Sequence, residues 1–233
     1  MNFLHELIFG YYPYLALTVF LLGSLIRFDR EQYTWRSGSS QLLRKRQFTW
    51  GNNLFHIGIL GLFLGHFVGL LTPIWIFDAI GISHSAKQMM AIVFGGLFGA
   101  MCFVGMTLLI HRRLFDVRIR KTSSAMDIFI LMLLYVQLIL GMITIPLSLG
   151  HLDGGNMVLF MEWAQHIVTL RGGAAALIVD SHWVFKVHIF LGLTVFLVFP
   201  FSRLVHIWSA PVWYVGRPYQ IVRTRRQPRG RKA

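Results

Sequence analysis

Five long apolar stretches dominate this chain, and each is long enough to cross a lipid bilayer. They run roughly over residues 7–26, 51–72, 88–110, 126–147 and 183–208. A helix of about 20 residues spans a hydrocarbon core of about 30 Å, because each residue adds about 1.5 Å of rise. Lipid offers no hydrogen-bond partner to open backbone groups, so each stretch must satisfy its own backbone as a helix. The sequence therefore predicts an all-α integral membrane bundle of five transmembrane helices.

The composition indicates a single domain. Hydrophobic residues make up 55% of the 233 residues and charged residues only 13%, which leaves too little polar surface to cover a compact water-soluble body. Residues 1–233 are therefore expected to form one transmembrane domain. The first stretch follows His5 and Glu6 rather than a basic region, so it is expected to be retained and not cleaved as a secretory signal. Within the longest connection, residues 157–169 are predicted to form a short amphipathic helix at the outer surface.

The net charge of +13 is concentrated in three segments outside the apolar stretches, 27–46, 112–121 and the basic tail 214–233. Short cytoplasmic loops of membrane proteins carry an excess of Lys and Arg. This pattern therefore predicts an amino terminus outside and a carboxyl terminus in the cytoplasm. The tail is expected to contact anionic membrane lipids, to dock on a cytoplasmic partner, or both. Nucleic acid is not an expected partner of such a bundle.

Four histidines lie inside two of the apolar stretches, His56 and His66 in the second and His188 and His206 in the fifth. Imidazole is rare in hydrocarbon and usually functional there, although a single one is as often a packed side chain or a proton relay. Two antiparallel helices would pair His56 with His206 near the cytoplasm, and His66 with His188 near the outer face. Two facing pairs are what two bis-histidine hemes require, so electron transfer is the leading hypothesis. Cys102 is the only cysteine, so covalent heme attachment is not expected.

The spacing of the histidines makes the hypothesis more specific. His188 and His206 are eighteen residues apart, which on a continuous helix is five turns and places both on one side. Pro200 lies between them and cannot donate a backbone hydrogen bond, so a bend is expected there. His56 and His66 are ten residues apart, which rotates one by about 80° from the other and calls for a tilt or kink.

Small and polar residues near the histidines leave two questions open. Gly69 and Gly192 could leave room for a flat macrocycle, whereas the ridge of Gly61, Gly65 and Gly69 is equally typical of ordinary helix packing. A ligand histidine also needs its other ring nitrogen held. The side chains of Asn52, Asn53 and Ser202 are candidates for that role, as are backbone carbonyls.

Three segments resemble the gamma subunit, the cytochrome b subunit, of membrane-bound respiratory nitrate reductase. They are FDREQYTWR (28–36), NLFHIGILGLFLGHFVGLLTP (53–73) and KVHIFLGLTVFLVFPFSRLVHIW (186–208). The resemblance covers essentially the whole chain except the tail after about Arg223, and all four histidines recur with family-like spacing. It implies two non-covalent hemes b, with iron bound by His56 and His206 in the proximal heme on the cytoplasmic side. His66 and His188 would bind the iron of the distal, outer heme.

The resemblance also implies a quinol site beside the distal heme, formed by Gly65, His66 and Lys87. The segment before Lys87, IFDAIGISHSA, departs from the family pattern by one extra residue. A lysine at the membrane boundary also has an ordinary explanation, because long cationic side chains extend to lipid head groups there. The two explanations for Lys87 carry equal weight from sequence alone.

The function implied by the resemblance is quinol oxidation, as one subunit of a quinol:nitrate oxidoreductase in the bacterial cytoplasmic (inner) membrane. Menaquinol or ubiquinol would be oxidised near the outer face, with protons released outside. Electrons would pass through both hemes to a cytoplasmic iron–sulfur beta subunit and a molybdenum alpha subunit. This chain alone is not expected to reduce nitrate.

Three alternatives remain. One is a heme b subunit of another quinone-linked complex, of formate dehydrogenase or hydrogenase type. Another is a histidine-bearing proton or ion transporter, which the near absence of Asp and Glu inside the second to fifth apolar stretches disfavours. The third is a structural anchor without a cofactor, which would leave four intramembrane imidazoles unexplained.

Overall fold

The computed structural model describes residues 2–35, 43, 45–209 and 216, and the described part of the chain is helical and contains no strand. The basic tail 214–233 lies outside the described residues except for Gly216. In chain order the elements are α1 (Phe3–Glu6), the π-helical turn η1 (Leu7–Tyr11), α2 (Tyr12–Arg30), the 3-10 turn η2 (Gln32–Thr34), α3 (Lys45–Leu71), α4 (Ile74–Ala79), α5 (His84–Phe115), α6 (Val117–Lys121), α7 (Ala125–Leu149), α8 (Gly155–Val168), α9 (Ala174–Leu177), α10 (Trp183–Val198), and the 3-10 segments η3 (Phe199–Phe201) and η4 (Arg203–Ser209).

Five of the described helical spans are long and apolar enough to cross a membrane. They are Phe3–Arg30, Lys45–Leu71, His84–Phe115, Ala125–Leu149 and Trp183–Phe201. This result confirms the five apolar helices predicted from the sequence and indicates a multi-pass membrane protein. Large apolar side chains stay exposed along the spans, including Leu22, Leu64 and Phe94, as expected for surfaces that face lipid.

Polar residues extend several helices beyond their apolar stretches. The Ser83 hydroxyl accepts a hydrogen bond from the backbone N–H of Ala86 and begins α5. Ser124 and Asp127 form a reciprocal capping box at the start of α7. Helices α5 and α7 therefore begin at polar side chains that satisfy open N–H groups, and not where their hydrophobic residues begin.

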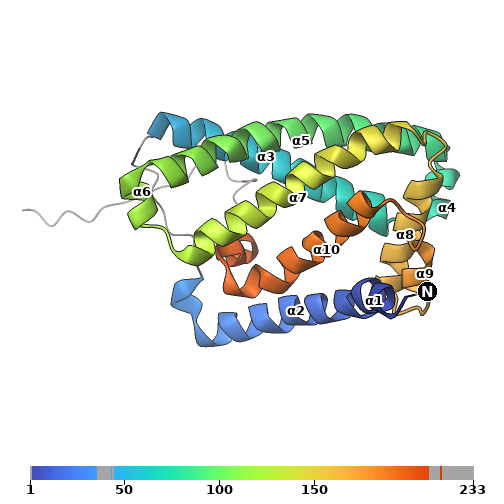
Figure 1. Cartoon of the computed structure of the whole chain (residues 1–233), viewed down its shortest axis with the longest axis horizontal. Coiled ribbons are helices and arrows are strands. Elements are labelled where there is room, and N and C mark those ends of the chain that lie inside the picture. Colours follow the sequence, from blue (N-terminus) through green and yellow to red (C-terminus); the bar gives the residue numbers. More distant parts are fainter. Residues whose placement is uncertain (1, 36–42, 44, 210–215, 217–233) are drawn as a thin grey trace, which may run out of the picture.

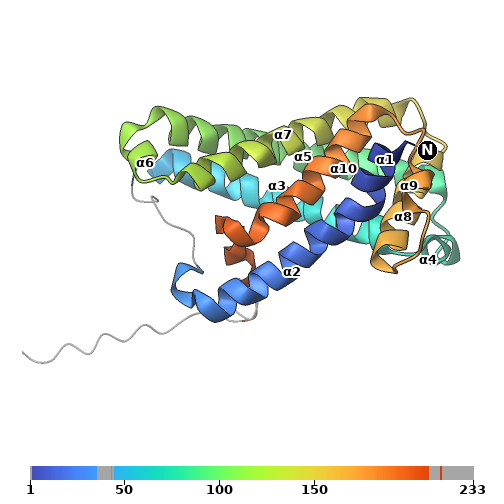
Figure 2. The same cartoon turned by 60° about the horizontal axis from the view of Figure 1, so that its bottom comes forward.

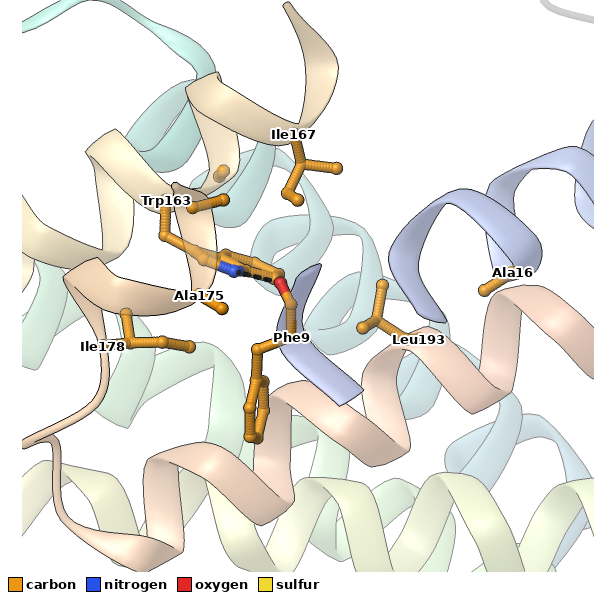
Figure 3. Close-up of a cluster of buried hydrophobic side chains, with 9 residues drawn as sticks. Phe9, Ala16, Trp163, Ile167, Ala175, Ile178 and Leu193 are labelled. Carbon is orange, nitrogen blue, oxygen red and sulfur yellow. Dashed lines mark hydrogen bonds between the residues drawn. The ribbon is translucent and has the colours of Figure 1, made fainter. Parts of the chain in front are cut away.

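The two ends of the bundle differ (Figure 1, Figure 2). The amino terminus lies with α4, α8 and α9 at one end, here called the α8 end, and α6 lies with the carboxyl end of α2 at the other, here called the α6 end. At the α8 end, η1 packs against α8 and α9 in a buried cluster (Figure 3). The indole Nε1 of Trp163 donates a hydrogen bond of 3.0 Å to the carbonyl of Phe9 there. The short helix expected over residues 157–169 is confirmed as α8.

Helices α3 and α5 run side by side (Figure 1, Figure 2) and approach closely through small residues. A methyl group added at Gly58 would lie 2.5 Å from the backbone nitrogen of Cys102. One added at Gly105 would lie 2.3 Å from the backbone nitrogen of Phe55. Both distances are shorter than van der Waals contact, so only glycine permits this approach.

The expectation of one continuous helix over residues 183–208 is wrong beyond Val198. Helix α10 ends there, and the chain continues through two 3-10 segments joined by Ser202, whose backbone is extended. The cause is Pro200, which removes a backbone donor and whose ring obstructs a continuing α-helix. His188 and His206 are therefore not related by five α-helical turns, and the argument that placed them on one side of one helix does not apply.

Candidate functional site

All four predicted histidines carry the same hydrogen bond. In each, Nδ1 lies within hydrogen-bond distance of a backbone carbonyl: Asn52 for His56 at 2.8 Å, Leu62 for His66 at 2.8 Å, Gln137 for His188 at 3.2 Å and Arg203 for His206 at 2.6 Å. A carbonyl oxygen only accepts, so the proton of each neutral ring is on Nδ1 and the lone pair is on Nε2, where a metal would bind. In His188 this Nε2 also lies 3.5 Å from the side-chain amide nitrogen of Gln137, a contact that a bound metal would replace. Of the candidates for holding the second nitrogen, the structure therefore selects backbone carbonyls.

The structure brings His66 and His188 together across α3 and α10. Their ring centres are 6.1 Å apart, and the ring planes are inclined by 41°. Metal–imidazole bonds of about 2 Å place two imidazoles on opposite sides of one metal ion with centres roughly 6 Å apart. The spacing and the donor set of this pair thus fit an iron bound by two histidines.

His56 and His206 are not brought into ring contact. Among the described residues, the one aromatic ring paired with that of His56 is Phe55, at 5.0 Å between centres. His206 lies on η4, beyond the break at Pro200. The structure thus assembles one of the two predicted pairs and leaves the other pair apart.

Arg27 of α2 holds the segment that leads to His206. Its guanidinium donates hydrogen bonds to the carbonyl of Pro200 at 2.5 Å and to that of Ser202 at 2.9 Å. A third bond, at 3.3 Å, goes to the carbonyl of Thr34. The carbonyls of Pro200 and Ser202 lack α-helical partners because α10 has ended, so a charged donor takes the place of the missing N–H groups.

The glycines near the histidines divide into two kinds. A methyl group at Gly61 would collide with the ring of Phe98 at 2.4 Å, so this glycine serves packing. At Gly65 and Gly69 a methyl group would meet no atom of another described part of the protein within 4 Å. At Gly192 it would lie 3.1 Å from the side-chain amide of Gln137, so this position accommodates a neighbouring side chain.

Lys87 is buried, with 8% of its surface exposed. Its Nζ donates a hydrogen bond of 3.1 Å to the carbonyl of Gly69, contacts the sulfur of Met161 and lies 3.8 Å from the ring centre of Phe77. This position contradicts the explanation in which Lys87 extends to lipid head groups. The bond instead ties α5 to the turn of α3 that follows His66.

Sequence reasoning missed the residues on α7 that contact His188. Gln137 contacts it with both backbone and side chain, and a methyl group at Gly141 would lie 3.0 Å from its Cε1 atom. One signal was available, because a glutamine inside an otherwise apolar membrane helix is a functional candidate. The described residues contain no group of three or more His, Cys, Asp or Glu side chains that could hold a metal ion.

Comparison with known proteins gives a consistent result. The sequence model described as "Nitrate reductase gamma subunit" matches residues 5–225. The respiratory nitrate reductase 1 gamma chain of Escherichia coli (strain K12) is 50% identical over 225 residues, which are 97% of this chain and 100% of that relative. The respiratory nitrate reductase 2 gamma chain of the same organism is 49% identical over 226 residues, with the same shares covered. The nitrate reductase gamma chain of Bacillus subtilis (strain 168) is 37% identical over 220 residues, 94% of this chain and 98% of the relative.

Proposed function

This chain belongs to the nitrate reductase gamma subunit family, and on that premise we propose that it is the membrane cytochrome b subunit of a respiratory nitrate reductase complex. It oxidises quinol and passes the electrons through two non-covalent hemes b. Its location is the bacterial cytoplasmic (inner) membrane, and residues 1–233 form one transmembrane diheme domain.

The observation that carries the proposal is the geometry of His66 and His188. Two imidazoles with centres 6.1 Å apart, each with Nδ1 bound to a carbonyl, are suited to hold the distal heme. His56 and His206 hold the proximal heme, and the same Nδ1 bond on each supports this role. The hemes, when bound, supply one-electron transfer across the bilayer.

The proposed orientation places the α8 end outside and the α6 end in the cytoplasm. The basic residues Arg118, Arg120 and Lys121 all belong to α6, as expected for a cytoplasmic end. The amino terminus then lies outside, and the basic tail 214–233 is cytoplasmic. The basic residues of the α6 end and the tail form the cytoplasmic surface on which the iron–sulfur beta subunit and the molybdenum alpha subunit dock.

The proposed quinol site is formed by Gly65, His66 and Lys87 at the α8 end. Gly65 leaves room on α3 beside His66, and Lys87 lies at a small apolar pocket of about 10 Å³ that Phe77 and Met161 also line. The ammonium of Lys87 exchanges its bond to the Gly69 carbonyl for one to a quinone oxygen. Menaquinol or ubiquinol enters there and releases two protons outside. Each electron that crosses works against roughly 2.3 kcal/mol per 100 mV, which nitrate, as the terminal oxidant, must supply.

A spectrum of the purified complex tests the proposal. We expect a reduced-minus-oxidised difference spectrum of heme b with two components. The substitutions His66→Ala and His188→Ala each remove the same component together with quinol oxidation, while His56→Ala and His206→Ala remove the other. His151→Ala, which changes an exposed histidine outside the helices, is the control. Retention of both components in the His66 or the His188 variant contradicts the pairing.

A further inference from the structure

His188 is held differently from the other three histidines. The Nδ1 atoms of His56, His66 and His206 bond to carbonyls three or four residues earlier in their own helices. The Nδ1 of His188 bonds instead to the carbonyl of Gln137, which belongs to α7. The orientation of this ring therefore depends on a neighbouring helix.

Gly141 exposes the carbonyl that His188 uses. In an α-helix each side chain leans toward the amino terminus and covers the turn before it, so a side chain at position 141 would cover the carbonyl of residue 137. A methyl group there would lie 3.0 Å from Cε1, 3.6 Å from Nδ1 and 3.7 Å from Nε2 of His188. The imidazole thus lies where that side chain would be.

The side chain of Gln137 makes a second link. Its amide Nε2 donates a hydrogen bond of 3.0 Å to the backbone carbonyl of His188, and it also lies 3.5 Å from the Nε2 of that ring. Gly192 makes room for this amide, because a methyl group at position 192 would lie only 3.1 Å from the Nε2 of Gln137. The Oε1 atom of Gln137 is buried and has no hydrogen-bond partner among the described residues, which is costly in an apolar surrounding. Packing alone would favour an apolar residue at this position.

We infer that Gln137 and Gly141 on α7 are positioning residues for His188 and set the orientation of the imidazole that would bind the distal heme. This inference rests on the proposed function, in which His188 binds heme iron. The bond at Nδ1 increases the basicity of the ring as a ligand, and the contact with Gly141 fixes the ring plane relative to that of His66. The basicity and the orientation of the His188 ring affect the reduction equilibrium of the distal heme, and that of the proximal heme stays unchanged.

The test is Gly141→Ala in the intact complex, with Gly96→Ala as the matched control. Residue 96 is also a glycine of a membrane helix, and a methyl group there meets only Ile145, at an ordinary 3.9 Å. We expect Gly141→Ala to change the electron paramagnetic resonance signal of the distal heme. We also expect about a tenfold change in its reduction equilibrium, which is about 59 mV for one electron. The proximal heme and the Gly96→Ala complex stay unchanged.

Gln137→Met provides a second variant if the alanine variant fails to assemble. Methionine keeps the length and the backbone carbonyl but removes the amide, so we expect a smaller shift confined to the distal heme. Unchanged distal signals in the assembled variants overturn the inference, as do equal shifts in both hemes. Absence of heme b from the unmodified complex would instead overturn the proposed function itself.

Discussion

The two halves of α3 use the same residue type for opposite purposes. In the amino-terminal part as far as residue 61, here called the packed half, Gly51, Gly58 and Gly61 face α5, and a methyl group on any of them would press on it, at 3.2, 2.5 and 2.4 Å respectively. In the remaining part, here called the open half, a methyl group at Gly65 or Gly69 would have no atom of another described part of the protein within 4 Å. A ridge of small residues therefore does not by itself predict helix packing, because glycines further along the same ridge can lack a neighbour to pack against.

The difference between the halves coincides with the difference between the histidines. His56 belongs to the half that is packed against α5, and it has no ring contact with His206. His66 belongs to the open half and already faces His188. The space that a flat ligand requires is thus present on α3 beside the second histidine.

The largest expected effect is on the packed half. Gly58→Val would place branched carbons against the backbone of Cys102, which cannot move without separating α3 from α5. We expect a loss of stability of about 3 kcal/mol or more, measured by thermal unfolding in detergent. Gly65→Val, with the same loss of helical flexibility, is the control and should unfold near the unmodified temperature. Equal unfolding temperatures for the two variants would erase the distinction between the halves.

A functional effect is expected on the open half. Gly65→Leu should leave the unfolding temperature nearly unchanged, because no atom of a neighbouring described residue lies within 4 Å of the Cβ position. It should lower quinol oxidation at least tenfold, about 1.4 kcal/mol, by filling the space beside His66. Nitrate reduction driven by a water-soluble donor that bypasses this chain should persist. A variant with full quinol oxidation would show that the space is not used.

The smallest change in stability is expected at Lys87, which bonds to the open half through Gly69. Lys87→Met keeps the length of the side chain and removes a buried charge, so we expect stability to stay the same or rise by about 1 kcal/mol. Quinol oxidation should fall, with KM affected more than kcat, because the ammonium contributes mainly to binding. Lys87→Arg retains the charge and serves as the comparison. A stability loss with unchanged kinetics would assign Lys87 a structural role only.

Sequence reasoning predicted what depends on local pattern. The five apolar helices followed from their length and hydropathy, and the bend at Pro200 followed from its missing donor. The bend was underestimated, since the α-helix ends at Val198 and does not resume before His206. A proline shows where a helix is weakened, but tertiary partners such as Arg27 decide what conformation replaces it.

Contacts between helices could not be predicted from the sequence. The separate roles of Gly61 and Gly65 depend on where Phe98 of α5 lies, which no periodicity of α3 reveals. The bond between Gln137 and His188 joins positions far apart in the chain. Helical periodicity gives the face of each residue, whereas the neighbour of that face is known only once the bundle is assembled.

The 3-10 conformation of η4 gives the number of residues in this stretch a special importance. Arg27 anchors the chain at the carbonyl of Ser202, and His206 follows four positions later. Each 3-10 residue turns the chain by about 120° and advances it by about 2 Å. Deleting a single residue between the anchor and the histidine would swing the imidazole a third of the way around the axis. The side chains between Ser202 and His206 can therefore be changed with less effect on the position of the imidazole than the number of residues between them.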